Sequence, residues 1–321
     1  YRVLIPADEA RETVEVCATG IYFVLGVEYH TETVATALFA PVPHIWYVDA
    51  ANPEAGDGSE ENPFQALPDA LAQCVAGRLD TVYAASGDYI AAPVPATTAL
   101  IGVDGAHHTR LSSGPGEKQG APTLALGDGA ALRGVSFDGG GTAVLTGGAA
   151  DIRNCIFINA GIGVDARGAL TAVNNTFHEN GVGCRLENGD VRNGIFSGNG
   201  IGIEMLDDGV CTSEYDLFHD NETAVSGGTA GQGSMLDDPL HVAPGAGNLH
   251  LRAASPARHA GDPDAAHNNP GGTRNDIGVD GGPFAIPDET PPQPHIVRTP
   301  ADDSVEVWTA VHLDASASYD E

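Results

Sequence analysis

Basic residues are scarce in this chain, and lysine is almost missing. Among its 321 residues, 14 are Lys or Arg against 44 Asp or Glu, which gives a formal net charge of −30, and Lys118 is the single lysine. A surface of this sign repels phosphate backbones and anionic membranes, so we expect no nucleic-acid partner. The acidic residues are spread along the chain, which fits a saline or calcium-rich exterior better than an acidic binding arm.

Long hydrophobic runs and metal-type cysteine spacings are missing as well. The longest apolar stretch, residues 20–27, is far shorter than the ~18 residues of a membrane-spanning helix, so no transmembrane segment is expected. The sequence opens without Met or a basic leader, so a signal peptide either has been removed or lies outside this sequence. No CxxC or Cys/His spacing occurs, which argues against zinc, haem attachment and a disulfide scaffold, although one bridge in an oxidising compartment stays open. The five cysteines are Cys17, Cys74, Cys155, Cys184 and Cys211.

A repeat of about 20 residues is the main feature that the chain does contain. Five phenylalanines mark it, at intervals of 20, 20, 19 and 22 residues. This period is too short for a helix-loop-helix repeat and fits one turn of a coiled sheet. We therefore predict a solenoid of short parallel strands whose turns stack about 4.8 Å apart. The phenylalanines are Phe137, Phe157, Phe177, Phe196 and Phe218.

Matching positions of the repeat predict which side chains face inward and where the chain bends. The Phe column and the apolar column seven positions later are expected to fill the interior, each side chain contributing about 1.5–3 kcal/mol. Cys184 lies in the second column, so we interpret it as a small core residue. Two Asn columns indicate two bends, because Asn tolerates left-handed backbone and can hydrogen-bond its like in the next turn. The apolar column is Val144, Val164, Cys184, Ile203 and Val225; the Asn columns are Asn154, Asn174 and Asn193, then Asn180, Asn199 and Asn221.

Together with its flanks, the repeat resembles the right-handed parallel β-helix of the pectin-lyase-like superfamily. The opening WYVDAANPEAGDGSEENPFQALPDALAQCVAG and the closing SPARHAGDPDAAHNNPGGTRNDIGVDGG are similar to the ends that such proteins carry. The resemblance covers about Trp46 to Phe284. It implies an all-β fold and a location outside the cell or on its surface, but one fold of this kind hosts many activities.

Changes of pattern predict the domain boundaries. Residues 1–45 alternate like antiparallel strands and faintly resemble the end of a PKD-type Ig-like domain; a strand pair packed on the solenoid is the alternative. Residues 46–285 form the β-helix, 286–303 a stiff Pro-rich linker, and 304–321 the opening strands of a PKD/Ig-like domain.

Two local features are expected within the β-helix. From Pro68 to Gly77, an apolar stripe of Leu71, Cys74 and Val75 predicts a short amphipathic helix that caps the first turn. Residues 107–121 are predicted to leave the wall as a surface excursion.

Outward charges on three consecutive turns form the candidate catalytic site. Asp165, Arg185 and Glu204 lie eight positions after their phenylalanines. Arg185 would grip the carboxylate of a uronic acid, while the two acids would hold calcium or move protons. Alternatively, opposite charges on adjacent strands simply pair, for about 0.2–1 kcal/mol each. Lyases of the resembling superfamily commonly use a Lys or Arg base beside an acidic calcium site, and the single lysine of this chain lies in the predicted excursion.

Weaker candidates for binding lie elsewhere on the surface. A second outward band is a candidate for substrate binding and contains His178, Glu179, His219 and Asp220. His178 and His219 are two turns, about 9.6 Å, apart, which is too far for a shared metal. Solvated surface is the alternative interpretation of this band. The only cofactor considered is structural calcium, without the spacing of an EF-hand. Its candidate ligands are Asp49, Asp57, Asp207 and Asp208.

Two functions of different class follow. The first is a noncatalytic, rigid module of a secreted or cell-surface protein, which serves adhesion, glycan contact or extracellular assembly with a glycan, a neighbouring surface protein or copies of itself. The second is a polysaccharide lyase or glycoside hydrolase acting on an acidic glycan. The missing lysines, the Ig-like flanks and a surface rich in Gly and Ala favour the first.

Overall fold

The structure is a computed structural model that describes residues 42–114, 121–206 and 209–286, together with the backbone of four further strands. Strands β1 (Thr13–Val24) and β2 (Val27–Leu38) pair antiparallel, as do β25 (Val297–Thr299) and β26 (His312–Asp314). Most of the predicted linker and of the C-terminal PKD/Ig-like strands lies outside the described residues. The predicted domain boundaries and the Ig-like character of both ends stay predictions.

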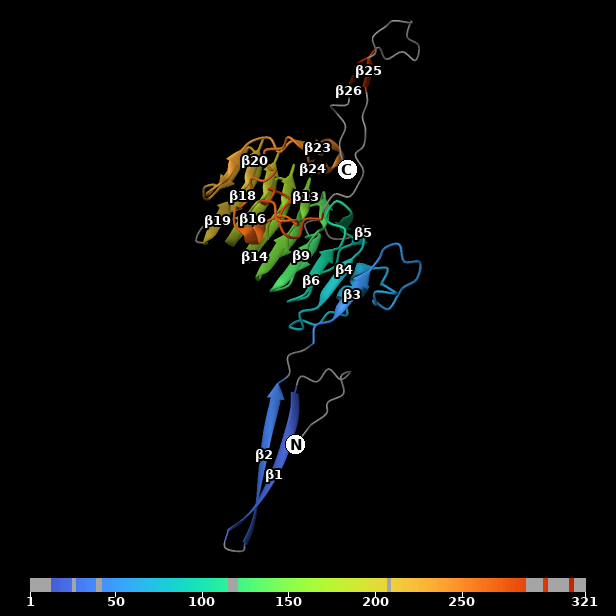
Figure 1. The fold of residues 1–321 in the computed structure, drawn as a ribbon, viewed down its shortest axis with the longest axis vertical. Helices are drawn as coiled ribbons and strands as arrows, with labels where there is room; N and C mark the ends of the chain where they lie inside the picture. Colours follow the sequence, from blue (N-terminus) through green and yellow to red (C-terminus); the bar gives the residue numbers. More distant parts are fainter. Residues whose placement is uncertain are drawn as a thin grey trace.

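The repeat region winds into a parallel β-solenoid of about seven turns (Figure 1). Its strands follow one another in chain order and form three rows. The first row contains β5 (Gly87–Ile90), β7 (Thr109–Ser112), β10 (Ser136–Asp138), β13 (Ile156–Ile158), β15 (Thr176–His178), β17 (Ile195–Ser197), β20 (Leu217–His219) and β22 (Met235–Leu236).

The other two rows are joined into one sheet because β14 (Ile162–Val173) and β16 (Val182–Arg192) run through both. Along the first parts of these strands lie β8 (Leu124–Leu126), β11 (Thr142–Thr146), β18 (Ile201–Met205) and β21 (Thr223–Ser226). Along their second parts lie β3 (Ile45–Val48), β4 (Thr81–Ala84), β6 (Ala99–Gly102), β9 (Ala130–Arg133), β12 (Ala150–Arg153) and β19 (Cys211–Glu214).

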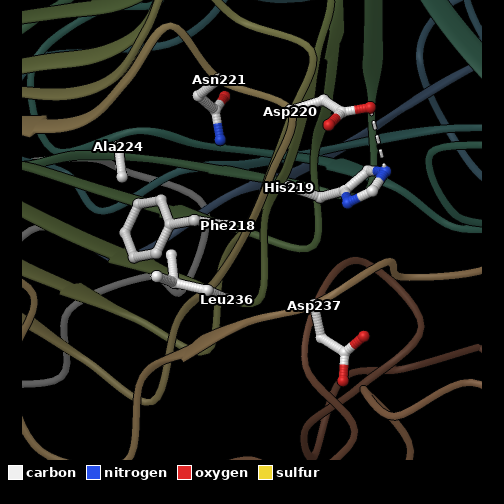
Figure 2. A pocket seen from close by; sticks show the side chains of 7 residues that line it. All are labelled: Phe218, His219, Asp220, Asn221, Ala224, Leu236 and Asp237. Atoms are coloured by element: carbon white, nitrogen blue, oxygen red, sulfur yellow. Dashed lines mark ion pairs between the residues drawn. The ribbon is translucent and has the colours of Figure 1, made fainter.

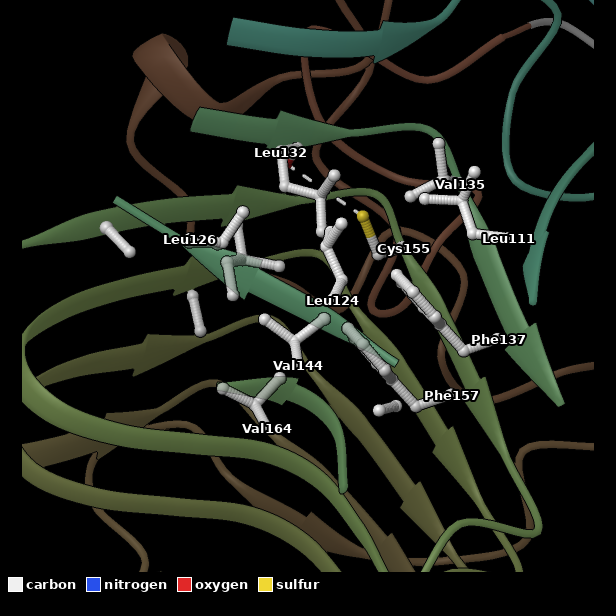
Figure 3. Close-up of a cluster of buried hydrophobic side chains, with 14 of the residues drawn as sticks. Leu111, Leu124, Leu126, Leu132, Val135, Phe137, Val144, Cys155, Phe157 and Val164 are labelled. Atoms are coloured by element: carbon white, nitrogen blue, oxygen red, sulfur yellow. Dashed lines mark hydrogen bonds between the residues drawn. The ribbon is translucent and has the colours of Figure 1, made fainter. Parts of the chain in front are cut away.

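The predicted interior is confirmed, except that Val225, at the end of its column, is only partly buried. All five phenylalanines are at most 2% exposed, each is in register with the next, and their stacked rings lie 4.8–5.4 Å apart. Val144, Val164, Cys184, Ile203 and Val225 are in register too, and Figure 3 shows the first two facing the Phe column. Cys184 is a fully buried free thiol, as predicted. These shared columns of side chains therefore set the register of the stacked turns.

The two Asn columns behave differently. In the second column, Asn180 donates to Asn199 (2.9 Å) and Asn199 donates to Asn221 (2.8 Å), which confirms the predicted ladder. In the first column, Asn154, Asn174 and Asn193 have φ of 49°, 56° and 55°, as a left-handed bend requires. Their side chains, however, do not bind each other. They bind a later part of the chain.

That later part, residues 261–286, is named the return segment here. It follows β23 (His241–Ala243), a 3₁₀ turn (Pro244–Ala246) and β24 (Asn248–Leu251), and it contains a second 3₁₀ turn (Ala265–His267). The segment is drawn in red-orange in Figure 1. Its hydrogen bonds show that it runs back along the first Asn column, against the order of the turns. Its contacts in chain order are Asp262 with Asn193 (2.8 Å), Asn275 with Asn174 (3.0 Å), Gly281 with Asn154 (2.7 Å) and Phe284 under the Arg133 guanidinium (3.4 Å).

The predicted helix exists but is shorter than expected. Helix α1 (Leu67–Leu71) has Pro in its first turn and buries Leu67, Ala70 and Leu71 beside the first turns of the solenoid. Val75 lies beyond its end and is 50% exposed, so the predicted stripe was too long. The reason is the buried Asp80 carboxylate, which accepts the backbone N–H of Val75 (2.9 Å) and thereby turns the chain out of the helix.

The predicted surface excursion is wrong for its first half. Thr109–Ser112 is strand β7, and its buried Leu111 stands in register with Phe137. Leu111 takes the position of the phenylalanine in its turn, but the different residue type and a gap of 26 positions to Phe137 hid it. Residues 115–120 lie outside the described part.

Candidate functional site

The candidate catalytic residues are adjacent, as their spacing predicted. Asp165 on β14, Arg185 on β16 and Glu204 on β18 are direct register partners. The Arg185 guanidinium lies 2.5 Å from a Glu204 oxygen and 3.8 Å from an Asp165 oxygen. Asp165 also binds Arg167, whose Nε lies 2.8 Å from Oδ1. The column is thus a chain of four alternating charges.

This arrangement pairs the charges with one another, although Oδ1 of Asp165 is buried without a hydrogen bond. Both carboxylates are opposed by a guanidinium, whereas calcium prefers a cage of oxygen ligands without a competing cation. The Arg185 guanidinium is held between these two acids. The distances therefore match the pairing that the sequence offered as an alternative, and the catalytic roles of Asp165, Arg185 and Glu204 stay a prediction.

The interpretation of the His band as solvated surface is wrong for His178. Its side chain is buried, with Nδ1 2.9 Å from the Ser197 hydroxyl, and the His241 ring packs edge-on at 6.1 Å. Burial lowers the pKa of His178 and lowers that of His241 to about 4. Strand β23, which the repeat pattern did not include, supplies the cover. Glu179, next in sequence, remains exposed.

His219 lies two strands from His178, as predicted, and lines a small open hollow of about 230 Å³ (Figure 2). His219 Nε2 is 3.3 Å from Asp220 and 3.9 Å from Asp238. The hollow thus offers a histidine, carboxylates and an apolar side. Of the four predicted binding residues, His219 and Asp220 line it. The remaining lining residues are Phe218, Asn221, Ala224, Leu236 and Asp237.

The predicted calcium ligands serve local turns where they are described. Asp49 accepts the backbone N–H of Ala51 (2.8 Å). Asp57 accepts the backbone N–H (3.0 Å) and hydroxyl (2.7 Å) of Ser59, and these hydrogen bonds lower its pKa. Asp207 and Asp208 lie outside the described residues. Calcium binding stays a prediction.

A cluster that the sequence did not reveal lies on another part of the molecule. His107, His250 and Asp280 bring two imidazoles and a carboxylate together, with all three ligand atoms within 4.8 Å of one another. His107 and Asp280 are 173 positions apart. No period or short motif links these residues, so the repeat could not have predicted their meeting.

Comparison with known proteins adds a distant likeness in fold. No family model and no curated relative matches the chain. A solved structure titled "Rhamnogalacturonan lyase" is 12% identical with a TM-score of 0.38, covering 56% of this chain and 69% of that one. The crystal structure of pectate lyase Pel9A is 12% identical with a TM-score of 0.39, covering 74% and 96%. We carry no residue role over from either.

Hydropathy of the described helices adds one more observation. Over the part of the chain that the structure describes, no helix is both long and apolar enough to cross a bilayer.

Proposed function

We propose that this chain is a noncatalytic, rigid module that works outside the cell or on its surface, in adhesion, glycan contact or extracellular assembly. The observation that carries the proposal is the pairing of Arg185 with Glu204 and Asp165. This outward column is the best candidate for chemistry in the sequence, and its charged groups are engaged with each other.

Rigidity supports a structural role. The stacked Phe column and the Asn180 to Asn221 ladder repeat the same contacts from turn to turn. A stack of this kind holds outward groups at the strand spacing of about 4.8 Å, which suits a long, regular partner such as a glycan chain. The hollow at His219 and Asp220 is the proposed point of glycan contact.

The finer architecture belongs to the same proposal. It includes right-handed winding, a capping role for α1 over the first turn, and PKD/Ig-like neighbours at both ends. The burial of Leu67 and Leu71 beside β3, β4 and β5 supports the capping role, because an open first turn would expose the interior and its strand edges.

A screen against acidic polysaccharides tests the proposal. The full chain is incubated with polygalacturonate, alginate and chondroitin, with and without calcium, and followed by ultraviolet absorbance of unsaturated products and by a reducing-end assay for hydrolysis. We expect no cleavage in either assay.

Matched variants decide how a positive result is interpreted. Arg185→Ala removes the centre of the column, whereas Arg110→Ala removes an exposed arginine that pairs with Asp138 on another face. Cleavage by the wild type that disappears in Arg185→Ala and persists in Arg110→Ala overturns the proposal in favour of a polysaccharide lyase or hydrolase.

A further inference from the structure

Two histidines and one aspartate, from three segments that are distant in the sequence, lie close together in the structure. His107 Nε2 lies 3.3 Å and His250 Nδ1 lies 3.2 Å from the same oxygen, Oδ1 of Asp280. The two imidazole rings stack with centroids 3.6 Å apart. We propose that this trio binds a divalent transition-metal ion, with Zn²⁺ as the best fit.

The site is held in place by apolar packing that needs no metal. Each ligand follows directly after a buried residue: Ala106 before His107, Leu249 before His250 and Val279 before Asp280. These three neighbours form a single cluster with Ile156. This cluster therefore fixes three elements together underneath the ligand atoms: the loop before β7, strand β24 and the return segment. Because folding already orders the ligands, metal binding does not have to supply the free energy for ordering them.

The carboxylate is anchored by the backbone. Its second oxygen, Oδ2, accepts the backbone N–H of Leu251 at 3.2 Å, which leaves Oδ1 directed at the two imidazoles. One carboxylate oxygen facing two imidazole nitrogens is a donor set that a divalent transition metal can bind.

The distances and donor types favour zinc over calcium. Four-coordinate zinc with bonds of about 2.0–2.1 Å places neighbouring ligand atoms about 3.3 Å apart, and the two observed separations from Asp280 are 3.3 and 3.2 Å. Imidazole nitrogen suits Zn²⁺, whereas Ca²⁺ takes six to eight oxygens. The stacked rings would rotate so that both nitrogens point at the ion, with the fourth position left to water.

Calorimetric titration of the chelator-treated full chain with ZnCl₂, and with CaCl₂ for comparison, tests the site. We expect one saturable Zn²⁺ site in the wild type and no comparable Ca²⁺ site. His250→Gln and Asp280→Asn should each weaken Zn²⁺ binding at least tenfold. His108→Gln changes an exposed histidine next to His107 and should leave the affinity unchanged.

A measurement on the wild type alone guards against variants that fail to fold. X-ray absorption of the zinc-loaded protein should show two imidazole ligands with the remaining shell from oxygen. Zn²⁺ bound with one imidazole or none overturns the proposal, and so does an affinity that His250→Gln and His108→Gln reduce equally. Because this readout is metal binding and not glycan cleavage, it stands or fails separately from the proposed function.

Discussion

At the scale of single residues, the bend two positions after each phenylalanine requires a left-handed backbone conformation. All five residues there have positive φ, between 49° and 81°, although their side chains differ. Left-handed backbone costs an ordinary residue roughly 1–2 kcal/mol, and Gly escapes this cost. The residues are Gly139, Asn159, Glu179, Gly198 and Asp220.

Glu179 is the poorest fit to this bend, so Glu179→Gly should stabilise the protein. We expect a gain of roughly 0.5–1 kcal/mol, because relief of the left-handed strain exceeds the added freedom of the unfolded chain. The shift in the urea midpoint measures it. Glu222→Gly is the matched control: this exposed loop glutamate has no positive φ, so the same change should lower stability.

Asp216 is a buried carboxyl with few partners. It is 0% exposed, and its oxygens accept the Gly194 N–H and the Ser213 hydroxyl, each at 2.7 Å. Burial raises the pKa of Asp216 to about 7, even though both hydrogen bonds act in the opposite direction. In the unfolded chain the pKa of an Asp is about 3.9.

This difference gives Asp216 a stability contribution of defined sign. Between about pH 4 and pH 7 the folded state binds the extra proton, so the contribution of Asp216 falls as pH rises through this range. Asp216→Asn keeps an acceptor for Gly194 and has no charge to bury. We expect the free energy of unfolding of this variant, relative to that of the wild type, to rise by on the order of 3 kcal/mol from pH 4 to pH 7. Parallel stability curves of the two proteins over this range contradict the prediction.

At the scale of elements, the first Asn column connects the solenoid to the return segment. Asn174 is buried, and its amide donates to Asn275 Oδ1 and to the carbonyls of Asp276 and Gly278, at 2.9–3.0 Å. One side chain thus satisfies three acceptors of a segment that has no sheet of its own.

Asn174→Gly should loosen the return segment without changing the bend. Glycine keeps the left-handed φ but removes these three hydrogen bonds and the one that Asn275 donates to Asn174 Oδ1 (3.1 Å), which we expect to cost about 1–3 kcal/mol. Hydrogen exchange of residues 275–281 should accelerate. Asn159→Gly is the matched control, because Asn159 has the same φ of 56° as Asn174 but its side chain donates only to Asp138 at the surface. This variant should leave the exchange of residues 275–281 unchanged. Equal acceleration in both variants contradicts the assigned contact.

The solenoid could be predicted from the sequence, and the return segment could not. Phe157, Phe177 and Phe196 repeat because every turn presents the same environment to the same position, so spacing alone fixes their register. Asn154 and Asn174 belong to this repeat as bends, yet their side chains bind residues more than 100 positions away. A non-repeating partner leaves no period to detect. The burial of His178 under His241 and the meeting of His107 with Asp280 were hidden for the same reason.

At the scale of the whole molecule, the net charge of −30 acts on stability. Self-repulsion of an acidic surface opposes the compact state and is screened by salt, with a Debye length falling from about 30 Å at 0.01 M to about 3 Å at 1 M. We expect the melting temperature to rise with NaCl over this range.

A charge variant separates screening from other effects of salt. Glu60 and Glu61 lie in an exposed loop, and replacing both with lysine makes the net charge four units less negative. The double variant should show a smaller rise in melting temperature with NaCl than the wild type. A melting temperature that falls with NaCl in the wild type is incompatible with dominant self-repulsion.

The return segment has a consequence for how this protein can change in length. Most solenoids grow or shrink by duplication or loss of a turn, since each turn touches only its neighbours. Here a single span of chain is matched to Asn193, Asn174, Asn154 and Arg133 in succession. An extra turn between Asn154 and Asn193 would displace the contacts of the return segment on one side of the insertion by about 4.8 Å relative to those on the other side. The number of turns is therefore fixed by the return segment, which lies outside the repeat.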